Sequence, residues 1–235
     1  VSAIEGTWTA EPEDGKPIIR VNAGEALLTA NRPDSDEDRP LFNPLRIADM
    51  NAVLANGEIN AYGAVVLDAN RQQLARFEAQ HDVDQGVGIA QINAERISFG
   101  PSLQPYDITE QARGMVEGVT GDAVVTADIN WNRDAITGTG RARLNNVSLA
   151  TSTIPVVNNV NGEILFDDLF ALTTPPGQVL QVGLLNPGVA VRNGRVRFQL
   201  LPEQQVSIEQ AEFDFAAGTL AMAPTRITLG SEETR

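Results

Sequence analysis

Strict alternation of apolar and polar side chains is the feature that most constrains how this chain can fold. In residues 125–131, Val125, Ala127, Ile129 and Trp131 alternate with polar residues. Successive side chains of a β-strand point to opposite faces of the sheet, so such a segment has one dry face and one solvated face. The same alternation occurs in residues 195–200, 210–215, 220–222 and 227–229. Strands of this kind are typical of antiparallel sheets, and we expect an all-β fold.

Asn-Gly pairs and prolines predict where the strands end. The Asn-Gly pairs at residues 56–57, 161–162 and 193–194 supply the positive φ angles of two-residue hairpin turns. Proline and glycine in residues 173–178 and 186–188 predict two further sharp reversals. Consecutive strands are therefore expected to pair as a meander.

One short helix is expected to interrupt the strands. Asp107 and Glu110 resemble a capping pair ahead of a helical apolar periodicity that ends near Gly118. Neighbouring prolines limit this helix to two or three turns. The expected parts of the chain are a sheet segment over residues 1–96, a loop and short helix over 97–117, and a second sheet segment over 118–235.

The charge and hydropathy patterns exclude several classes of partner. The formal net charge is −14, with no basic stripe, so the surface repels nucleic-acid phosphates. The longest uncharged run, residues 169–191, holds three prolines and three glycines, which indicates turns rather than a membrane-spanning helix. The chain begins Val1-Ser2-Ala3 and stops soon after a strand-like segment, and we expect it to be a piece of a longer protein.

Residues that could perform catalysis are scarce. Cysteine is absent and His81 is the only histidine, so neither a thiolate site nor a His-rich metal site can form. The adjacent Asp167 and Asp168 would point to opposite faces of a strand and are poorly placed to act as an acid–base pair. We therefore expect no enzyme activity, no catalytic residue and no cofactor.

Acidic residues at two places have part of the spacing of a calcium-binding loop. The acids of residues 34–38 alternate as such a loop requires, but Arg39 replaces its glycine and Leu45 its closing carboxylate. Asp82 and Asp84 fail in the same way. Both places are interpreted as solvated turns, and no metal site is expected.

Several segments, taken together and in order, carry a family resemblance. They are residues 97–101, 103–105, 119–131, 162–169, 174–178, 186–188 and 206–220. In sequence and spacing they resemble the YdbH-type domain of the AsmA-like family, whose other branches include TamB and YhdP. The resemblance covers about residues 97–230, and Ala217 stands where the family usually has the first of two glycines.

The resemblance implies a lipid-transport function in a bacterial envelope. It implies a long twisted antiparallel sheet that forms an open groove (a β-taco) in the periplasm of a Gram-negative bacterium, anchored to the inner membrane by a segment outside this chain. Phospholipid acyl chains would be shielded by the apolar face between the inner and outer membranes, with unknown membrane proteins at the two ends. Exposed sheet edges could also allow self-association. From their alternation, the residues expected to face lipid are Val125, Ile129, Ile164, Phe166, Val182, Leu184, Val196, Phe198, Ile208, Phe213, Leu220 and Met222.

Two other functions fit the same alternation. In a structural β-sandwich, such as a scaffold or adhesin module, the dry face would be a closed core between two sheets. A carbohydrate- or peptidoglycan-binding module would use exposed Trp and Tyr side chains, of which the chain has only two each. Trp8 and Trp131 are interpreted as core or interface anchors before sugar platforms.

Overall fold

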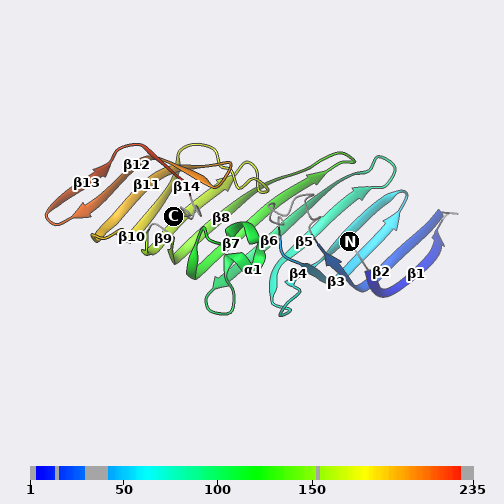
Figure 1. Ribbon diagram of the computed structural model, residues 1–235. Coiled ribbons are helices and arrows are strands. Elements are labelled where there is room, and N and C mark those ends of the chain that lie inside the picture. Colours follow the sequence, from blue (N-terminus) through cyan, green and yellow to red (C-terminus); the bar gives the residue numbers. More distant parts are fainter. Residues whose placement is uncertain (1–3, 14–15, 30–41, 152–153, 229–235) are drawn as a thin grey trace, which may run out of the picture. The chain divides into compact units, whose positions relative to one another are not determined.

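The computed structural model describes residues 4–13, 16–29, 42–151 and 154–228, and most of these lie in β-strands (Figure 1). The acidic residues 34–38 lie outside the described residues. The strands are β1 (Ile4–Glu13), β2 (Lys16–Leu28), β3 (Leu45–Ala55), β4 (Glu58–Leu67), β5 (Gln73–Asp82), β6 (Val87–Phe99), β7 (Glu117–Trp131), β8 (Ile136–Ala150), β9 (Val156–Phe166), β10 (Gln178–Asn186), β11 (Val191–Leu201), β12 (Gln205–Phe215), β13 (Gly218–Met222) and β14 (Thr225–Thr228). The helical part consists of α1 (Pro105–Ile108) and a 3₁₀ turn (Glu110–Ala112).

The strands form an antiparallel meander, as predicted. Hydrogen-bonded neighbours follow chain order from β1 to β13, and β14 pairs with β12. β13 and β14 keep one register along β12, because Ala211 pairs with Met222 and Ile208 pairs with Thr225. Pro224 lies between them and has no N–H to donate, which explains the break. Within the described part of the chain, β1 and β13 each pair with one strand only, so the sheet is open at both ends.

The chain divides into two compact units. Unit 1 comprises Val1–Glu95 and Thr126–Gly138, and unit 2 comprises Arg96–Val125 and Thr139–Arg235. β7 and β8 therefore contribute residues to both units. The apolar face of each unit is described by itself below.

Of the three predicted Asn-Gly turns, one is confirmed and two are wrong. Residues 56–57 connect β3 and β4 with φ of 54° and 83°, the positive values that such a hairpin requires. The pairs at 161–162 and 193–194 instead lie inside β9 and β11. The predicted reversals at 173–178 and 186–188 are confirmed, with φ of 80° at Gly177 and 123° at Gly188.

A line of backbone irregularities crosses the sheet of unit 2, and we call it the bend line of unit 2. Its members, on β7 to β11, are Gly121, Asn146, Asn159, Gly183 and Asn193. All except Gly183 have positive φ, between 50° and 107°. A Cβ on Gly121 would stand 2.5 Å from the Asn146 carbonyl oxygen, and one on Gly183 would stand 2.8 Å from the Asn159 Cβ. Such irregularities bend a strand, and glycine and asparagine tolerate them best.

A second bend line crosses unit 1. Its members, on β1 to β4, are Gly6, Gly24, Asp49 and Gly63. The pairing register shifts at Gly6, on both sides of Gly24, and around Asp49, which has a φ of 51°. A Cβ on Gly63 would stand 3.0 Å from the Ala48 carbonyl oxygen. Close backbone approach therefore requires glycine at Gly6 and Gly63.

The helix is shorter than predicted and begins earlier. α1 is a single turn that starts at Pro105, since proline has the φ of a first helical residue and needs no N–H acceptor there. Its N-cap is Gln104, whose backbone N–H donates to the Asp107 carboxylate at 2.8 Å. The predicted Asp107–Glu110 capping pair is therefore wrong. Glu110 opens the 3₁₀ turn and forms an ion pair with Arg113.

Candidate lipid-facing surface

Strand registers define the apolar face of unit 2. Directly opposed residues on neighbouring strands point to the same face of the sheet. One apolar row crosses β10 to β13 and consists of Leu180, Val196, Ala211 and Met222. Phe198 pairs with Ile208 in the next row. The apolar face therefore continues across these strands as the alternation predicted.

The middle of this face is a packed hydrophobic cluster. Its buried members are Val119, Val147, Val157, Val160, Val182, Val191, Phe198, Ile208, Ala211 and Phe213. Val157 and Val160 lie on either side of Asn159, so the bend line brings apolar side chains from both of its sides into one cluster. Phe213 is 5% exposed, and a Cβ on Gly194 would stand 2.1 Å from its ring. Gly194 is therefore required for the ring to pack here.

The twelve predicted lipid-facing residues occupy three kinds of environment. Those in the buried cluster are Val182, Phe198, Ile208 and Phe213, and those packed against it are Ile164 and Val196. Those half-buried elsewhere are Val125, Phe166 and Leu184 in unit 2 and Ile129 in unit 1. Leu220 and Met222 are 48% and 40% exposed. The apolar face of unit 2 is thus filled by its own side chains in the middle and exposed at β13.

Leu184 lies in a different row from the cluster. Its partner on β11 is the exposed Arg192, whereas Leu185 pairs with Val191, a member of the cluster. The alternation changes phase at Gly183 on the bend line. The apolar–polar alternation of the sequence does not reveal this change of phase. It therefore predicted Leu184, rather than Leu185, on the apolar face.

Unit 1 has an apolar face of its own, although only one predicted lipid-facing residue, Ile129, lies in this unit. One row crosses β2 to β6 and consists of Val21, Ala52, Ala61, Ala79 and Ala90. Ala61 and Ala79 are half-buried, whereas Asn60 and Gln80, on the opposite face, are exposed. Alternation over residues 75–80 carries this signal, but alanine marks a dry face less clearly than larger apolar residues. The small side chains leave this part of the face flat and open.

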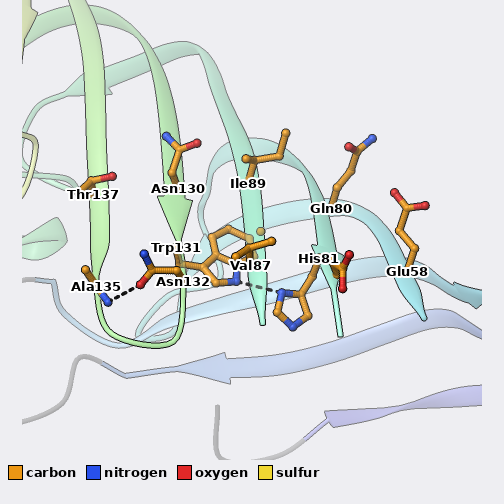
Figure 2. Close-up of a pocket in the computed structure, with 12 residues that line it drawn as sticks. Glu58, Gln80, His81, Val87, Ile89, Asn130, Trp131, Asn132, Ala135 and Thr137 are labelled. Carbon is orange, nitrogen blue, oxygen red and sulfur yellow. Dashed lines mark hydrogen bonds between the residues drawn. The ribbon is translucent and has the colours of Figure 1, made fainter. Parts of the chain in front are cut away.

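His81 belongs to the next row of this apolar face. The row consists of Ile19, Leu54, Ile59, His81 and Gly88. Trp131 lies over Gly88, where a Cβ would stand 2.3 Å from the indole ring. The Trp131 Nε1–H donates to His81 Nδ1 at 3.2 Å, and the two rings stack with centroids 6.0 Å apart (Figure 2). His81 and Trp131 thus pack against each other, and their polar atoms satisfy one another.

Unit 1 carries two shallow hollows. One has a volume of about 450 Å³, and Figure 2 shows Gln80, Ile89, Asn130 and Thr137 along one side of it. The other, of about 580 Å³, lies over β2 to β6 and includes Tyr62. Charged groups lie beside amide and aliphatic side chains in both hollows. The first is also lined by Glu58, His81 and Asp82, and the second by Arg20 and Glu78.

The remaining acidic candidates are structural. Asp167 and Asp168 follow β9 rather than lying on a strand, so their predicted strand position is wrong. Asp168 Oδ1 accepts hydrogen bonds from the N–H groups of Phe170 and Ala171 at 2.8 and 3.0 Å, and Asp167 accepts one from the Thr173 hydroxyl at 2.7 Å. Among the residues that the structure describes, no group of three or more His, Asp or Glu side chains could hold a metal ion.

One carboxylate is strongly paired. Arg96 donates to both oxygens of Asp122 at 3.0 and 2.9 Å, and the Ser98 hydroxyl donates to it at 2.6 Å. These hydrogen bonds, first from Arg96 and then from Ser98, lower the pKa of Asp122 below its ordinary value. The group joins the end of β6 to the start of β7 within unit 2.

Comparison with protein families identifies the chain. The model of the YdbH-like family, described as intermembrane phospholipid transport protein YdbH, matches residues 2–235. The chain belongs to the YdbH-like family. No curated protein and no solved structure gives a match. Within the described residues of this YdbH-like chain, no helix is long and apolar enough to cross a membrane.

The family is described as one of intermembrane phospholipid transport, in agreement with the resemblance found in the sequence. The match also extends over the first 96 residues, where the sequence motifs are weaker. Both units of the YdbH-like chain therefore contribute candidate surfaces for lipid.

Proposed function

We propose that the apolar face of this sheet shields phospholipid acyl chains during their transfer between the inner and outer membranes. The observation that supports this most directly is the alanine-rich row of unit 1, which includes Ala61 and Ala79. Ala61 and Ala79 are half-buried, whereas the neighbouring strand residues Asn60 and Gln80, on the opposite face, are exposed. The family description supports phospholipid as the cargo.

The energetics of this surface suit passive shielding of lipid. Each methylene group moved from water onto an apolar surface contributes about 0.8 kcal/mol. Alanine side chains leave room above the sheet, so an acyl chain can lie across Ala61 and Ala79 while its head group stays in water. Movement along such rows needs no proton transfer, metal or cofactor from the chain.

The expected location and partners follow from the intermembrane role of the family. We place the chain in the periplasm of a Gram-negative bacterium, held to the inner membrane by a segment outside residues 1–235. Proteins of the inner and outer membranes would receive lipid at the two ends of the full-length protein.

A closed sandwich or scaffold module is the alternative, and the strand order disfavours it. A sandwich needs a second sheet to cover the apolar face. In the described ranges every strand belongs to the same sheet, and no second sheet covers Ala61 or Ala79. Trp131, a candidate sugar platform, is instead engaged by His81 and Gly88.

Site-specific photo-crosslinking tests the proposed function. A benzophenone amino acid at Ala61 or Ala79 should capture radiolabelled phosphatidylethanolamine from vesicles. The same group at Asn60 or Gln80, one residue away on the opposite face, is the matched control and should capture little. Equal labelling at the two pairs of positions would contradict the proposal.

A further inference from the structure

The segment between β6 and β7 packs on one end of the hydrophobic cluster of unit 2. We call residues 100–118 the strap. It begins with a turn in which Gly100 and Leu103 exchange backbone hydrogen bonds of 3.0 and 3.1 Å, and Leu103 is 0% exposed. Phe99, just before the strap, and Val116, near its end, both pack against the cluster. The strap therefore lies on apolar surface.

The buried side chain of Gln104 attaches the strap to β7. Its Nε2 donates to the Val119 carbonyl oxygen at 2.8 Å, and the Val119 N–H donates to its Oε1 at 2.8 Å. These are the two hydrogen bonds that a neighbouring strand would make. Val119 is itself a cluster member, 3% exposed, and Nε2 also donates to the Gly100 carbonyl at 2.7 Å. One amide thus closes the first turn of the strap and fixes that turn to the cluster.

Two glycines with positive φ lie at the other end of the strap, the second of them already in β7. Gly114 and Gly118 have φ of 79° and 58°, a region that glycine enters without steric cost. No atom lies within 4 Å of a Cβ built on either residue. The space beside these two glycines is therefore open, and glycine tolerates a change of backbone conformation there.

We propose that the strap is a gate on the lipid path of unit 2, held shut by the Gln104 amide. This inference rests on the proposed function. In the closed state Val119 and its neighbours are covered, and the cluster is filled by its own side chains. Breaking the two bonds to Val119 and pivoting at Gly114 and Gly118 exposes this end of the cluster to an acyl chain. The Gln104 amide is neutral, and water can replace its hydrogen bonds to Val119. Opening of the gate therefore needs no proton and no cofactor.

Hydrogen exchange of the complete chain tests the gate. Vesicles of phosphatidylethanolamine and phosphatidylglycerol should accelerate exchange of the Leu103 and Val119 amides while β10 to β12 stay protected. Without lipid, Gln104→Ala should raise exchange at the same two amides by about tenfold, because a buried hydrogen-bond pair is lost. It should also increase lipid capture by a crosslinker at Val116.

Gln178→Ala is the matched control. Gln178 is another buried amide of unit 2, 8% exposed, which accepts from the Leu165 N–H at 2.9 Å and donates to the Pro175 carbonyl at 3.1 Å. It is the first residue of β10 and holds the connection from β9, so its loss should leave exchange of the strap amides and lipid capture at Val116 unchanged.

The possible outcomes separate the gate from the proposed function. Capture of lipid at Ala79 without faster exchange in the strap overturns the gate and leaves the proposed function standing. Equal effects of Gln104→Ala and Gln178→Ala on the strap amides also overturn it. Absence of lipid capture at Ala79 in the unmodified chain overturns the proposed function, and the gate with it.

Discussion

Phe213 and Leu220 oppose each other across β12 and β13, yet only one of them is buried. Phe213 is 5% exposed because its ring fits against Gly194, whereas Leu220 is 48% exposed on the last paired strand. Alternation predicted that both point to the apolar face. It could not predict which is covered, because burial depends on the partner surface that the fold brings against each side chain.

A charge introduced at these two positions should therefore have very different costs. Phe213→Arg should lower the free energy of unfolding by about 3–5 kcal/mol, since it removes a core ring and buries a cation without a partner. Leu220→Arg should change it by less than about 1 kcal/mol, because the side chain remains in solvent. Urea denaturation of the two variants measures this. Similar losses of stability in the two variants would show that the Phe213 side chain is as exposed as the Leu220 side chain.

The Arg96–Asp122 pair gives stability a dependence on acid pH. Because the pKa of Asp122 is lowered in the folded state, the pair stabilises the fold above the ordinary carboxyl pKa of about 4. That contribution is lost as the pH falls through the lowered pKa. The stability difference between the unmodified chain and Asp122→Asn should thus be present at neutral pH and shrink below about pH 4. Thermal unfolding over this range tests it, and a constant difference would contradict it.

At the scale of the strands, the two bend lines explain where sequence reasoning failed. Asn-Gly at residues 193–194 has the chemistry of a hairpin turn, and Asn193 does adopt positive φ, at 50°. The same backbone conformation serves a bend inside β11, because both structures need a residue that tolerates the left-handed region. The Asn-Gly pair thus correctly predicted positive φ at Asn193. It wrongly predicted a turn between two strands, where the structure has a bend within β11. Only pairing with the strands on both sides distinguishes a bend from a turn.

Substitutions of two adjacent asparagines in β9 test the bend line. Asn159 has a φ of 56°, whereas Asn158 is not among the residues with positive φ. Asn159→Val should cost about 1–2 kcal/mol of stability, since a β-branched residue is strained in the left-handed region. Asn158→Val, the control, should cost much less. Equal costs in chemical denaturation would mean that the bend does not depend on the conformation of Asn159.

At the scale of the whole molecule, the class of fold was predictable and the extent of the functional surface was not. An antiparallel meander follows from alternation and short connections, and the resemblance correctly pointed to the YdbH-like family. Apart from Ile129, no residue of unit 1 was predicted to face lipid, because its apolar face is built from alanines such as Ala61 and Ala79. Alanine marks a dry face less clearly than a larger apolar residue does, so alternation in these strands is hard to recognise in the sequence.

The open edge at β13 and β14 should favour self-association of the isolated chain. β13 is exposed along its whole length, with Leu220 and Met222 on it. Exposed apolar edge strands can pair with another chain, and lysine on an edge opposes this. Met222→Lys should shift the chain toward monomer in analytical ultracentrifugation. Val189→Lys is the control, because Val189 is 59% exposed but lies in the connection between β10 and β11. An equal shift toward monomer in both variants would mean that any added charge reduces association, rather than a charge on the β13 edge in particular.

The sequential order of the strands also makes the length of this fold adjustable. Every strand from β2 to β12 lies between its two neighbours in the chain, so one hairpin more or less need not disturb any other pairing. Neighbouring strands lie about 4.8 Å apart, and each added hairpin would lengthen the apolar face by about 10 Å. Duplication or loss of hairpins is thus a simple evolutionary route by which such a protein could match envelopes of different width.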